Sequence, residues 1–388
     1  MSWPLVKLGE VAPSKALKNP VVLSDDNVWQ LNLDMVESNS GRIINKLKAP
    51  LSEAGSSTHW FDERHVLYSK LRPYLNKVVL PDEQGLATTE LVPMLPDPEV
   101  IDRRYLVHYL RSQQFVSWIS DQVAGAKMPR VSMKVFWDHE IPLPPLVEQK
   151  RIAAILDKAD AIRQKRKQAI ELADEFLRSV FLDMFGDPVT NPKGWEIKTI
   201  GELATKVTDG EHQTPKRQEK GYKLLSARNV QHGFLDVENE KVDHVGEAEF
   251  QRITKRLSIS KSDVLLSCSG TIGRVSMNTL NEPFCLVRSV AVIRLAEHGV
   301  IPEFLVGYLG TSAMQAIMKK EANSSGQPNL FQNQIKQLNV LVPPLELQAE
   351  YKRFLDHYKE KKVSLIAAND QQALLFKSLS QNAFSGQL

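Results

Sequence analysis

PPLVEQKRIAAILDKADAIRQKRKQAIELADEFLRSVFLDMFG, residues 144–186, holds the clearest structural signal in this chain. No proline or glycine occurs between Pro145 and Gly186. Apolar residues recur there at intervals of three and four, the pattern of a helix face that packs in a coiled coil. We expect one helix over 146–186, about 60 Å long at ~1.5 Å per residue. The seam residues are Ile152, Ile155, Ala159, Ile162, Ala169, Ala173, Phe176 and Val180, interrupted by Arg166.

The same pattern returns later in the chain at a constant spacing. Trp3 and Trp195 lie 192 positions apart, and from Pro129 onward the offset is 199. A constant offset over so long a stretch indicates an internal duplication, so we expect two similar halves. Pairs related by 199 positions are Pro129 and Pro328, Pro144 and Pro343, Gln149 and Gln348, Leu156 and Leu355, Ser179 and Ser378, and Phe185 and Phe384.

The second copy predicts a partner helix over 345–388. Because one apolar stripe needs another to cover it, we expect the two helices to pair antiparallel within the chain. The second seam consists of Tyr351, Phe354, Tyr358, Leu365, Ala368, Leu375 and Leu379, interrupted by Lys361 and Gln372.

The segments before the two helices predict strand-rich α+β units. HVLYSKLRPYLNKV (65–78) and SDVLLSCSGTIGRV (262–275) share a Val-Leu-x-Ser strand, a turn, a basic residue and a return strand. We expect an α+β fold with an internal pseudo-two-fold repeat, in which the long helices separate two globular units. If the helix pair lay along B-DNA, at ~3.4 Å per base pair, its length of about 60 Å would span at most about 18 base pairs. The expected segments are globular units over 1–145 and 195–344, helices over 146–186 and 345–388, and a linker over 187–194.

Composition excludes several classes of protein. Of 388 residues, 42% are hydrophobic, too many for a disordered chain. No run of about 18 apolar residues or secretory signal occurs, so we expect a cytoplasmic protein without a membrane partner. Cys268 and Cys285 do not form a CxxC motif, and we expect both to be buried. The net charge of +3, from 49 basic and 46 acidic residues, permits DNA binding without arguing for it.

No catalytic constellation is evident in the sequence. The chain contains no GxxxxGK[ST] loop, no HExxH and no Asn/Asp-Pro-Pro-aromatic motif of amino-methyltransferases. Asp138, Glu148 and Lys150 have a nuclease-like spacing, but the second copy has no acidic residue at the matching positions. We therefore expect neither a catalytic site nor a metal site. A self-sufficient nuclease or methyltransferase and a coiled-coil scaffold without a DNA role are the alternatives.

Side chains suited to DNA contact gather in predicted loops of both halves. Cationic groups bind phosphates, while hydroxyl and amide groups read base edges. The basic run Arg163, Lys165, Arg166 and Lys167 is either a nucleic-acid patch or a solvated helix face, and Arg72 could instead anchor its turn. The candidate DNA contacts are Lys70, Arg72, Tyr74, Lys77, Lys127, Arg130, Thr214, Lys216, Arg217, Arg228, Asn229, Ser269, Thr271, Arg274, Gln327 and Asn329.

Five motifs occur together in this chain: IPLPPLVEQKRIAAILDKADAI (141–162), FLDMFGDPVTNPKGW (181–195), HVLYSKLRPYLNKV (65–78), SDVLLSCSGTIGRV (262–275) and VLVPPLELQ (340–348). Together they resemble the specificity subunit of type I restriction–modification systems. The resemblance implies a non-catalytic adaptor with target recognition domains over 1–145 and 195–344, each reading one half of an asymmetric, bipartite site in double-stranded DNA. It further implies that the helices set the spacer and dock two modification subunits, which restriction subunits then join. S-adenosylmethionine, ATP and magnesium would belong to those partners, and this chain would bind no cofactor.

Overall fold

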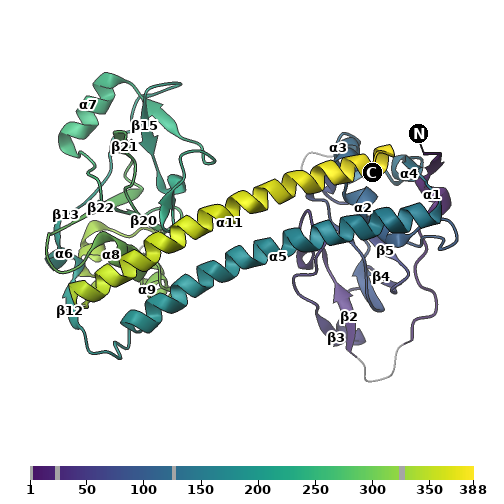
Figure 1. The fold of residues 1–388 in the computed structure, drawn as a ribbon, viewed down its shortest axis with the longest axis horizontal. Coiled ribbons are helices and arrows are strands. Elements are labelled where there is room, and N and C mark those ends of the chain that lie inside the picture. The colour runs from purple at the N-terminus through teal and green to yellow at the C-terminus, as the bar shows by residue number, and fades with distance from the viewer. Residues whose placement is uncertain (1–2, 22–26, 125–127, 323–327) are drawn as a thin grey trace. The chain divides into compact units, whose positions relative to one another are not determined.

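The computed structural model describes residues 3–21, 27–124, 128–322 and 328–388. The chain divides into two compact units: unit 1 comprises Met1–Gln168 and Leu365–Leu388, and unit 2 comprises Ala169–Ser364. Two long unbroken helices, α5 (Leu146–Phe185) and α11 (Leu345–Ser385), each begin in one unit and end in the other (Figure 1). Each unit therefore contains the start of one long helix and the end of the other.

Unit 1 is strand-rich in its described residues. A four-stranded sheet has the order β3-β2-β7-β4, a three-stranded sheet has the order β6-β5-β8, and β1–β11 and β9–β10 form pairs. β2 runs parallel to β7, whereas β3 is antiparallel to β2. The strands are β1 (Leu5–Lys7), β2 (Asn27–Leu31), β3 (Lys48–Pro50), β4 (Thr58–Phe61), β5 (Val66–Ser69), β6 (Val78–Val79), β7 (Gly85–Thr88), β8 (Leu91–Met94), β9 (Val123–Ala124), β10 (Arg130–Val131) and β11 (Glu140–Pro142).

The described residues of unit 2 form a matching set of sheets. Their strand orders are β13-β22-β19-β20 and β14-β18-β15-β21, with β12–β23 and β16–β17 as separate pairs. β15 runs parallel to β21, as β2 does to β7 in unit 1. The strands are β12 (Glu196–Thr199), β13 (Ala204–Asp209), β14 (Arg217–Gln218), β15 (Tyr222–Leu225), β16 (Val230–Gln231), β17 (Phe234–Leu235), β18 (Asp243–Val245), β19 (Val264–Ser267), β20 (Val275–Met277), β21 (Phe284–Leu286), β22 (Val290–Leu295) and β23 (Asn339–Val342).

Short helices begin at residues that satisfy their free amides. The Asp102 carboxylate accepts hydrogen bonds from the first amides of α2, and the Ser112 hydroxyl does the same for α3. Thr199 and Glu202 form a reciprocal capping box on α6. The short helices are α1 (Leu8–Val11), α2 (Arg103–Arg111), α3 (Gln113–Ser120) and α4 (Met133–Trp137) in unit 1, and α6 (Ile200–Leu203), α7 (Glu247–Arg256), α8 (Pro302–Leu309), α9 (Ser312–Ala322) and α10 (Gln332–Gln337) in unit 2.

Both long helices contribute side chains to the hydrophobic core of each unit. In unit 1, Ile152 of α5 and Phe384 of α11 are buried together, and the Phe384 ring lies 5.5 Å from that of Tyr105. In unit 2, Phe185 of α5 lies 5.6 Å from the Tyr351 ring of α11. Burial of aromatic and aliphatic side chains at both ends explains why the helices stay docked on their units.

A fully buried glutamine fixes the start of each long helix. The Gln149 amide donates to the carbonyls of Val100 (3.0 Å) and Pro144 (2.8 Å), and its carbonyl accepts from the amide of Asp102 (2.8 Å). Since the glutamine satisfies buried backbone groups, its loss would leave them unpaired. In unit 2, Gln348 makes the same three bonds to Gly299 (2.9 Å), Ile301 (2.8 Å) and Pro343 (2.8 Å).

The expected fold class is confirmed as α+β with an internal repeat and paired long helices. The pairing is antiparallel in unit 1, where Arg151 contacts the Leu388 carbonyl and Arg166 contacts that of Ala368. The expectation that the globular units occupy the two ends of the helix pair stays a prediction, as do the expected domain bounds. Cys268 and Cys285 are both buried with free thiols. Within the described part of the chain, no helix is both long and apolar enough to cross a membrane.

Candidate nucleic-acid interface

In unit 1, the loop that follows β5 carries several residues expected to contact DNA. The Ser69 amide donates to the Lys77 carbonyl (3.1 Å), which closes the loop at its base. Leu71 forms a backbone bridge with Arg130, so the segment before α4 lies against this loop. The residues of this loop and of the segments bonded to it, which we call the loop edge of unit 1, are Lys70, Arg72, Tyr74, Glu90 and Arg130.

Charge on the loop edge of unit 1 is only partly neutralised. Arg130 lies 2.9 Å from a carboxylate oxygen of Glu90, and this hydrogen bond lowers the pKa of Glu90 and raises that of Arg130. Arg72 is exposed, and no described residue pairs with its guanidinium. Its backbone is left-handed (φ 50°), which is uncommon for a residue with a side chain. Within the described part of the chain, the Arg72 side chain therefore does not anchor its turn.

Two residues expected to contact DNA instead have structural roles. Lys77 donates from Nζ to the Leu33 carbonyl (2.6 Å), and burial lowers its pKa. Asn229 is 1% exposed, and its amide donates to the carbonyls of Asp236 (3.1 Å) and Lys241 (3.3 Å). Their polar atoms are already used inside the unit, which argues against a DNA contact at both residues, and the expected contacts stay untested predictions.

In unit 2, the loop after β19 repeats the backbone arrangement of unit 1. The Ser267 amide donates to the Arg274 carbonyl (2.8 Å), and Ser269 forms a bridge with Asn329. Asp209 ends β13 at the same edge of the sheet, since it pairs with Ala291 beside the Ser267–Val290 pair. The loop edge of unit 2 consists of Asp209, His212, Ser269, Thr271, Arg288, Asn329 and Gln332.

Asp209 holds two other members of the loop edge of unit 2. Its carboxylate lies 3.0 Å from Nε2 of His212 and accepts a hydrogen bond from the Gln332 amide. The carboxylate side chain is 16% exposed, whereas the His212 side chain is 55% exposed. Asp209 therefore orients polar side chains that remain open to solvent.

The remaining candidates have varied surroundings. Arg217 lies on β14 and is ion-paired with Asp243 (2.9 Å), while Arg274 is partly buried at the end of its loop. Thr214, Lys216 and Arg228 are exposed. Lys127 and Gln327 lie outside the described residues. A DNA role for these side chains stays a prediction.

Arg288 and Gln332 are members of the loop edge that the sequence did not single out. Neither belongs to a motif that repeats between the halves. Arg288 precedes β22 by two residues, and Thr89 occupies the matching place before β8. Because only one half has a cation at that position, comparing the two halves of the sequence does not single out Arg288.

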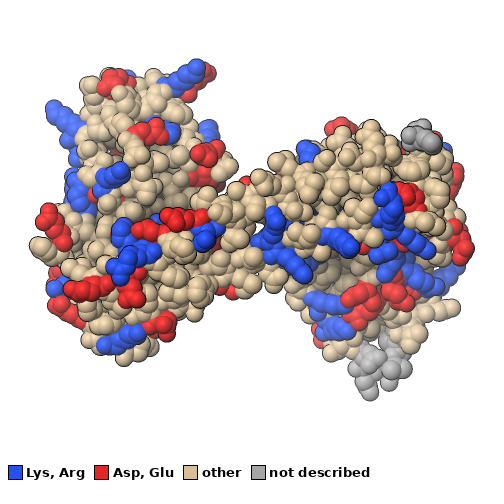
Figure 2. All heavy atoms as spheres, viewed as in Figure 1, with Lys and Arg blue, Asp and Glu red and all other residues tan. Residues whose placement is uncertain are grey.

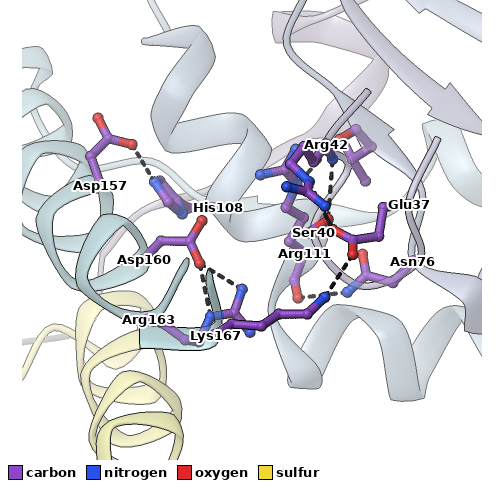
Figure 3. A network of polar contacts seen from close by, with 11 residues as sticks. Glu37, Ser40, Arg42, Asn76, His108, Arg111, Asp157, Asp160, Arg163 and Lys167 are labelled. Atoms are coloured by element: carbon purple, nitrogen blue, oxygen red, sulfur yellow. Dashed lines mark hydrogen bonds and ion pairs between the residues drawn. The ribbon is translucent and has the colours of Figure 1, made fainter. Parts of the chain in front are cut away.

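The basic run of α5 is used inside unit 1 (Figure 3). Arg163 pairs with Asp160, Arg166 donates to a carbonyl of α11, and Lys167 lies 2.8 Å from Glu37. The hydrogen bond from Lys167 is the main cause that lowers the pKa of Glu37 to about 2. The Arg163–Asp160 pair lies within α5, whereas Arg166 and Lys167 hold α5 to other elements of its own unit. These contacts favour neither a DNA patch nor a merely solvated face.

The predicted helix seam is closed at the helix ends. Ile152 and Tyr351 are 1% and 2% exposed, and both belong to hydrophobic cores. Farther along the pair, the rings of Phe176 and Phe354 lie 6.0 Å apart and Tyr358 donates to Asp174, but Phe176 is 58% exposed. Ile155 and Leu379 are half-buried.

The seam is open in the middle of the helices, which the heptad pattern did not predict. Ile162 is 45% exposed, Leu365 39% and Leu375 51%. Spacing in sequence defines a stripe but not how closely a partner covers it. These three residues and Phe176 therefore do not form a closed coiled-coil core.

Basic and acidic side chains are interspersed over both units on the face drawn in Figure 2. This distribution agrees with the small net charge of +3. In the nuclease-like spacing, Asp138 pairs with Lys7 (3.0 Å) and Glu148 with Arg151 (2.6 Å), so each carboxylate has its own cation. Among the described residues, no group of three His, Cys, Asp or Glu is placed to hold a metal ion.

Known proteins match both halves of the chain. The model of the type I restriction modification DNA specificity domain family matches residues 66–172 and 192–374. The MjaVIII specificity subunit of Methanocaldococcus jannaschii is 24% identical over 300 residues, 72% of this chain and 69% of that protein. The EcoKI specificity subunit of Escherichia coli is 25% identical over 320 residues, 76% of this chain and 68% of that protein.

Solved structures share the fold at low sequence identity. A chain from a structure of a type I restriction–modification system aligns over 100% of this chain and 98% of its own length, with TM-score 0.59 and 17% identity. The S subunit of M. genitalium aligns over 98% and 96%, with TM-score 0.55 and 15% identity. Because the family model matches most of this chain and includes both repeats, the chain belongs to the type I restriction–modification DNA specificity family and is a specificity subunit, the non-catalytic component that recognises DNA sequence.

Proposed function

We propose that unit 1 and unit 2 each read one half of an asymmetric, bipartite site in double-stranded DNA. The observation that carries this proposal is the repeated loop backbone with unlike side chains. Lys70 and Arg72 of unit 1 correspond to Cys268 and Gly270 of unit 2 in the order of the two loops. Base edges are distinguished by the donors and acceptors that meet them, so unlike loop edges would select unlike half-sites.

The long helices would set the spacer between the half-sites. α5 has 40 residues and α11 has 41, and each begins in one unit and ends in the other. At ~1.5 Å per residue, each is about 60 Å long. A helix is stiff over this length, so the proposed spacer follows from the number of residues in the pair.

Apolar side chains left open on the helices support docking of modification subunits. Besides the open seam, Leu172 is 54% exposed, Val363 68% and Leu374 68%. Exposed apolar side chains mark protein-binding surfaces where they form a contiguous patch, and we propose that these residues belong to one. We propose that two modification subunits bind, one for each repeat, and that restriction subunits join this complex. S-adenosylmethionine, ATP and magnesium would then belong to the partners, with no cofactor on this chain.

A paired insertion tests the spacer and the two half-sites together. Seven residues of helix-forming sequence are inserted between Gln168 and Ala169 of α5, and seven between Leu365 and Ile366 of α11. These points face each other in the antiparallel pair, as the Arg166–Ala368 contact indicates. The pair should lengthen by about 10 Å, which is about three base pairs. Mapping of methylated adenines should show both half-sites unchanged and a longer spacer; an unchanged spacer in an active complex would contradict the proposal.

A further inference from the structure

The loop edges of the two units share a set of backbone hydrogen bonds. The Lys70 amide donates to the Glu90 carbonyl (3.0 Å), as the Cys268 amide does to that of Ser289 (2.9 Å). The Lys70 carbonyl accepts from Val131 (3.0 Å), as the Cys268 carbonyl accepts from Leu330 (2.8 Å). These bonds make the positions of the two edges directly comparable.

Cations occupy different positions in this shared backbone. The edge of unit 1 has Lys70, Arg72 and Arg130. The matching positions of unit 2 are uncharged: Cys268, the left-handed Gly270 (φ 78°) and Asn329. In unit 2 the arginine stands instead at Arg288, where unit 1 has the uncharged Thr89.

Arg288 is fixed by its backbone and open at its side chain. Its amide donates to the Glu211 carbonyl (3.0 Å), and its carbonyl accepts from the Cys268 thiol (3.4 Å). Cys268 is 4% exposed, so the backbone of Arg288 lies against a buried group. The side chain itself is exposed, and within the described ranges no carboxylate or carbonyl engages its guanidinium. An ordered backbone with an uncommitted guanidinium is suited to bind an external anion or acceptor pair.

We propose that Arg288 contacts the DNA half-site of unit 2, at a position not equivalent to that of Arg72 in unit 1. This inference rests on the proposed function. A guanidinium binds either phosphate oxygens or the O6 and N7 atoms of guanine, and both lie within one DNA ligand. The two units would then place their principal arginines at different points of the two half-sites, which adds to the asymmetry of the site.

The test uses the complex assembled with its modification subunits and a duplex carrying the methylated site mapped for the wild type. R288A is compared with R288K and with K261A. Lys261 is an exposed cation before the other end of β19, so K261A removes the same charge from unit 2 away from the loop edge. Thermal unfolding of each variant verifies that the fold is retained. Binding is measured with either half-site altered and at several salt concentrations.

R288A should weaken binding by roughly 5- to 150-fold, with K261A within about twofold of wild type. A base contact would confine the loss to duplexes with an intact second half-site, and R288K would not restore it. If Arg288 contacts a phosphate, R288A would weaken binding to all duplexes alike and reduce the slope of log affinity against log salt concentration by about one. R288K would then largely restore binding. Affinity of R288A within about twofold of wild type on every duplex would overturn the inference. Sequence-independent binding by the wild-type complex would instead refute the proposed function.

Discussion

Gln149 of unit 1 and Gln348 of unit 2 make the same three hydrogen bonds, whereas Arg72 and Gly270 occupy matching loop positions and share only a left-handed backbone. The glutamines satisfy buried amides and carbonyls, so a change at either position costs stability. The loop residues face solvent and no buried group depends on their side chains. Duplication thus preserved the residues that hold the backbone and left the outward side chains free to diverge.

A second contrast lies at the helix ends. In unit 2, Phe181 packs closely over Gly307, and the offset of 199 places Ser380 and His108 at these positions in unit 1. The His108 ring is 7% exposed and lies 2.7 Å from Asp157 of α5. The phenylalanine and glycine that pack together in unit 2 are thus replaced in unit 1 by a serine and by a histidine that contacts α5.

The largest expected effect is loss of a buried glutamine. Q149L and Q348L should each lower the free energy of unfolding by about 3 to 5 kcal/mol, because each leaves buried backbone groups unpaired. Chemical denaturation measures both variants. Similar losses of unfolding free energy in the two variants would support the view that the two helix starts are equivalent. A loss under about 1 kcal/mol in either variant would contradict that view.

Filling the glycine at the helix end of unit 2 should have the next largest effect on stability. A Cβ on Gly307 would lie 2.8 Å from Cε2 of Phe181 and 2.9 Å from the Tyr351 hydroxyl. G307A should therefore destabilise the chain by about 2 kcal/mol through overpacking. Adding F181L should recover part of that loss in thermal unfolding. An undiminished loss in the double variant would show that Phe181 is not the residue that requires glycine.

R72G separates DNA binding from stability in unit 1. The glycine accepts the left-handed backbone but adds freedom to the unfolded chain, so stability should change by less than about 1 kcal/mol. Binding at the first half-site should weaken by about 1 to 3 kcal/mol. The reverse change G270R places a side chain on left-handed backbone and should cost about 1 kcal/mol in stability. Wild-type affinity of R72G in titrations of the assembled complex would refute a DNA role for Arg72.

The smallest expected effect concerns the contact between Glu37 and α5. Ile366, at the α11 position that matches Lys167 by the 199 offset, cannot form such a pair. The folded pKa of Glu37, about 2, lies below its ordinary value of 4.5, so its contribution is present above about pH 4.5 and is lost as the pH falls toward 2.

At pH 7, E37Q should be less stable than wild type by about 1 kcal/mol, because Lys167 is half-exposed and solvent screens the pair. The difference should vanish near pH 2 in a series of denaturation curves. E53Q, at an exposed glutamate of unit 1, is the matched control. A difference independent of pH would exclude the charge of Glu37 as its cause.

The sequence predicted the helices and the repeat because both depend on local signals. Pro145 and Gly186 bound the first helix, and its periodicity is visible without tertiary information. Closure of the seam was not predictable, since the spacing of Ile162 is the same whether or not a partner covers it.

The candidate site was predicted only in part, because the polarity of a residue does not reveal whether its side chain points to solvent or into the unit. Arg72 is exposed as expected, whereas Asn229 is folded inward to bond its own backbone. Arg288 lies beside the loop after β19 only through strand pairing, which no neighbouring residue in the sequence indicates.

Mapping of methylated adenines, in cells that carry this chain with a modification subunit, tests whether each unit reads its own half-site independently. It is performed with the wild type and after residues 211–230 are exchanged for those of a relative with a different specificity. We expect one half of the recognised site to change, while the other half and the spacer stay the same. A change in both halves, or a recognised site that is not divided into two parts, would contradict independent reading by two units.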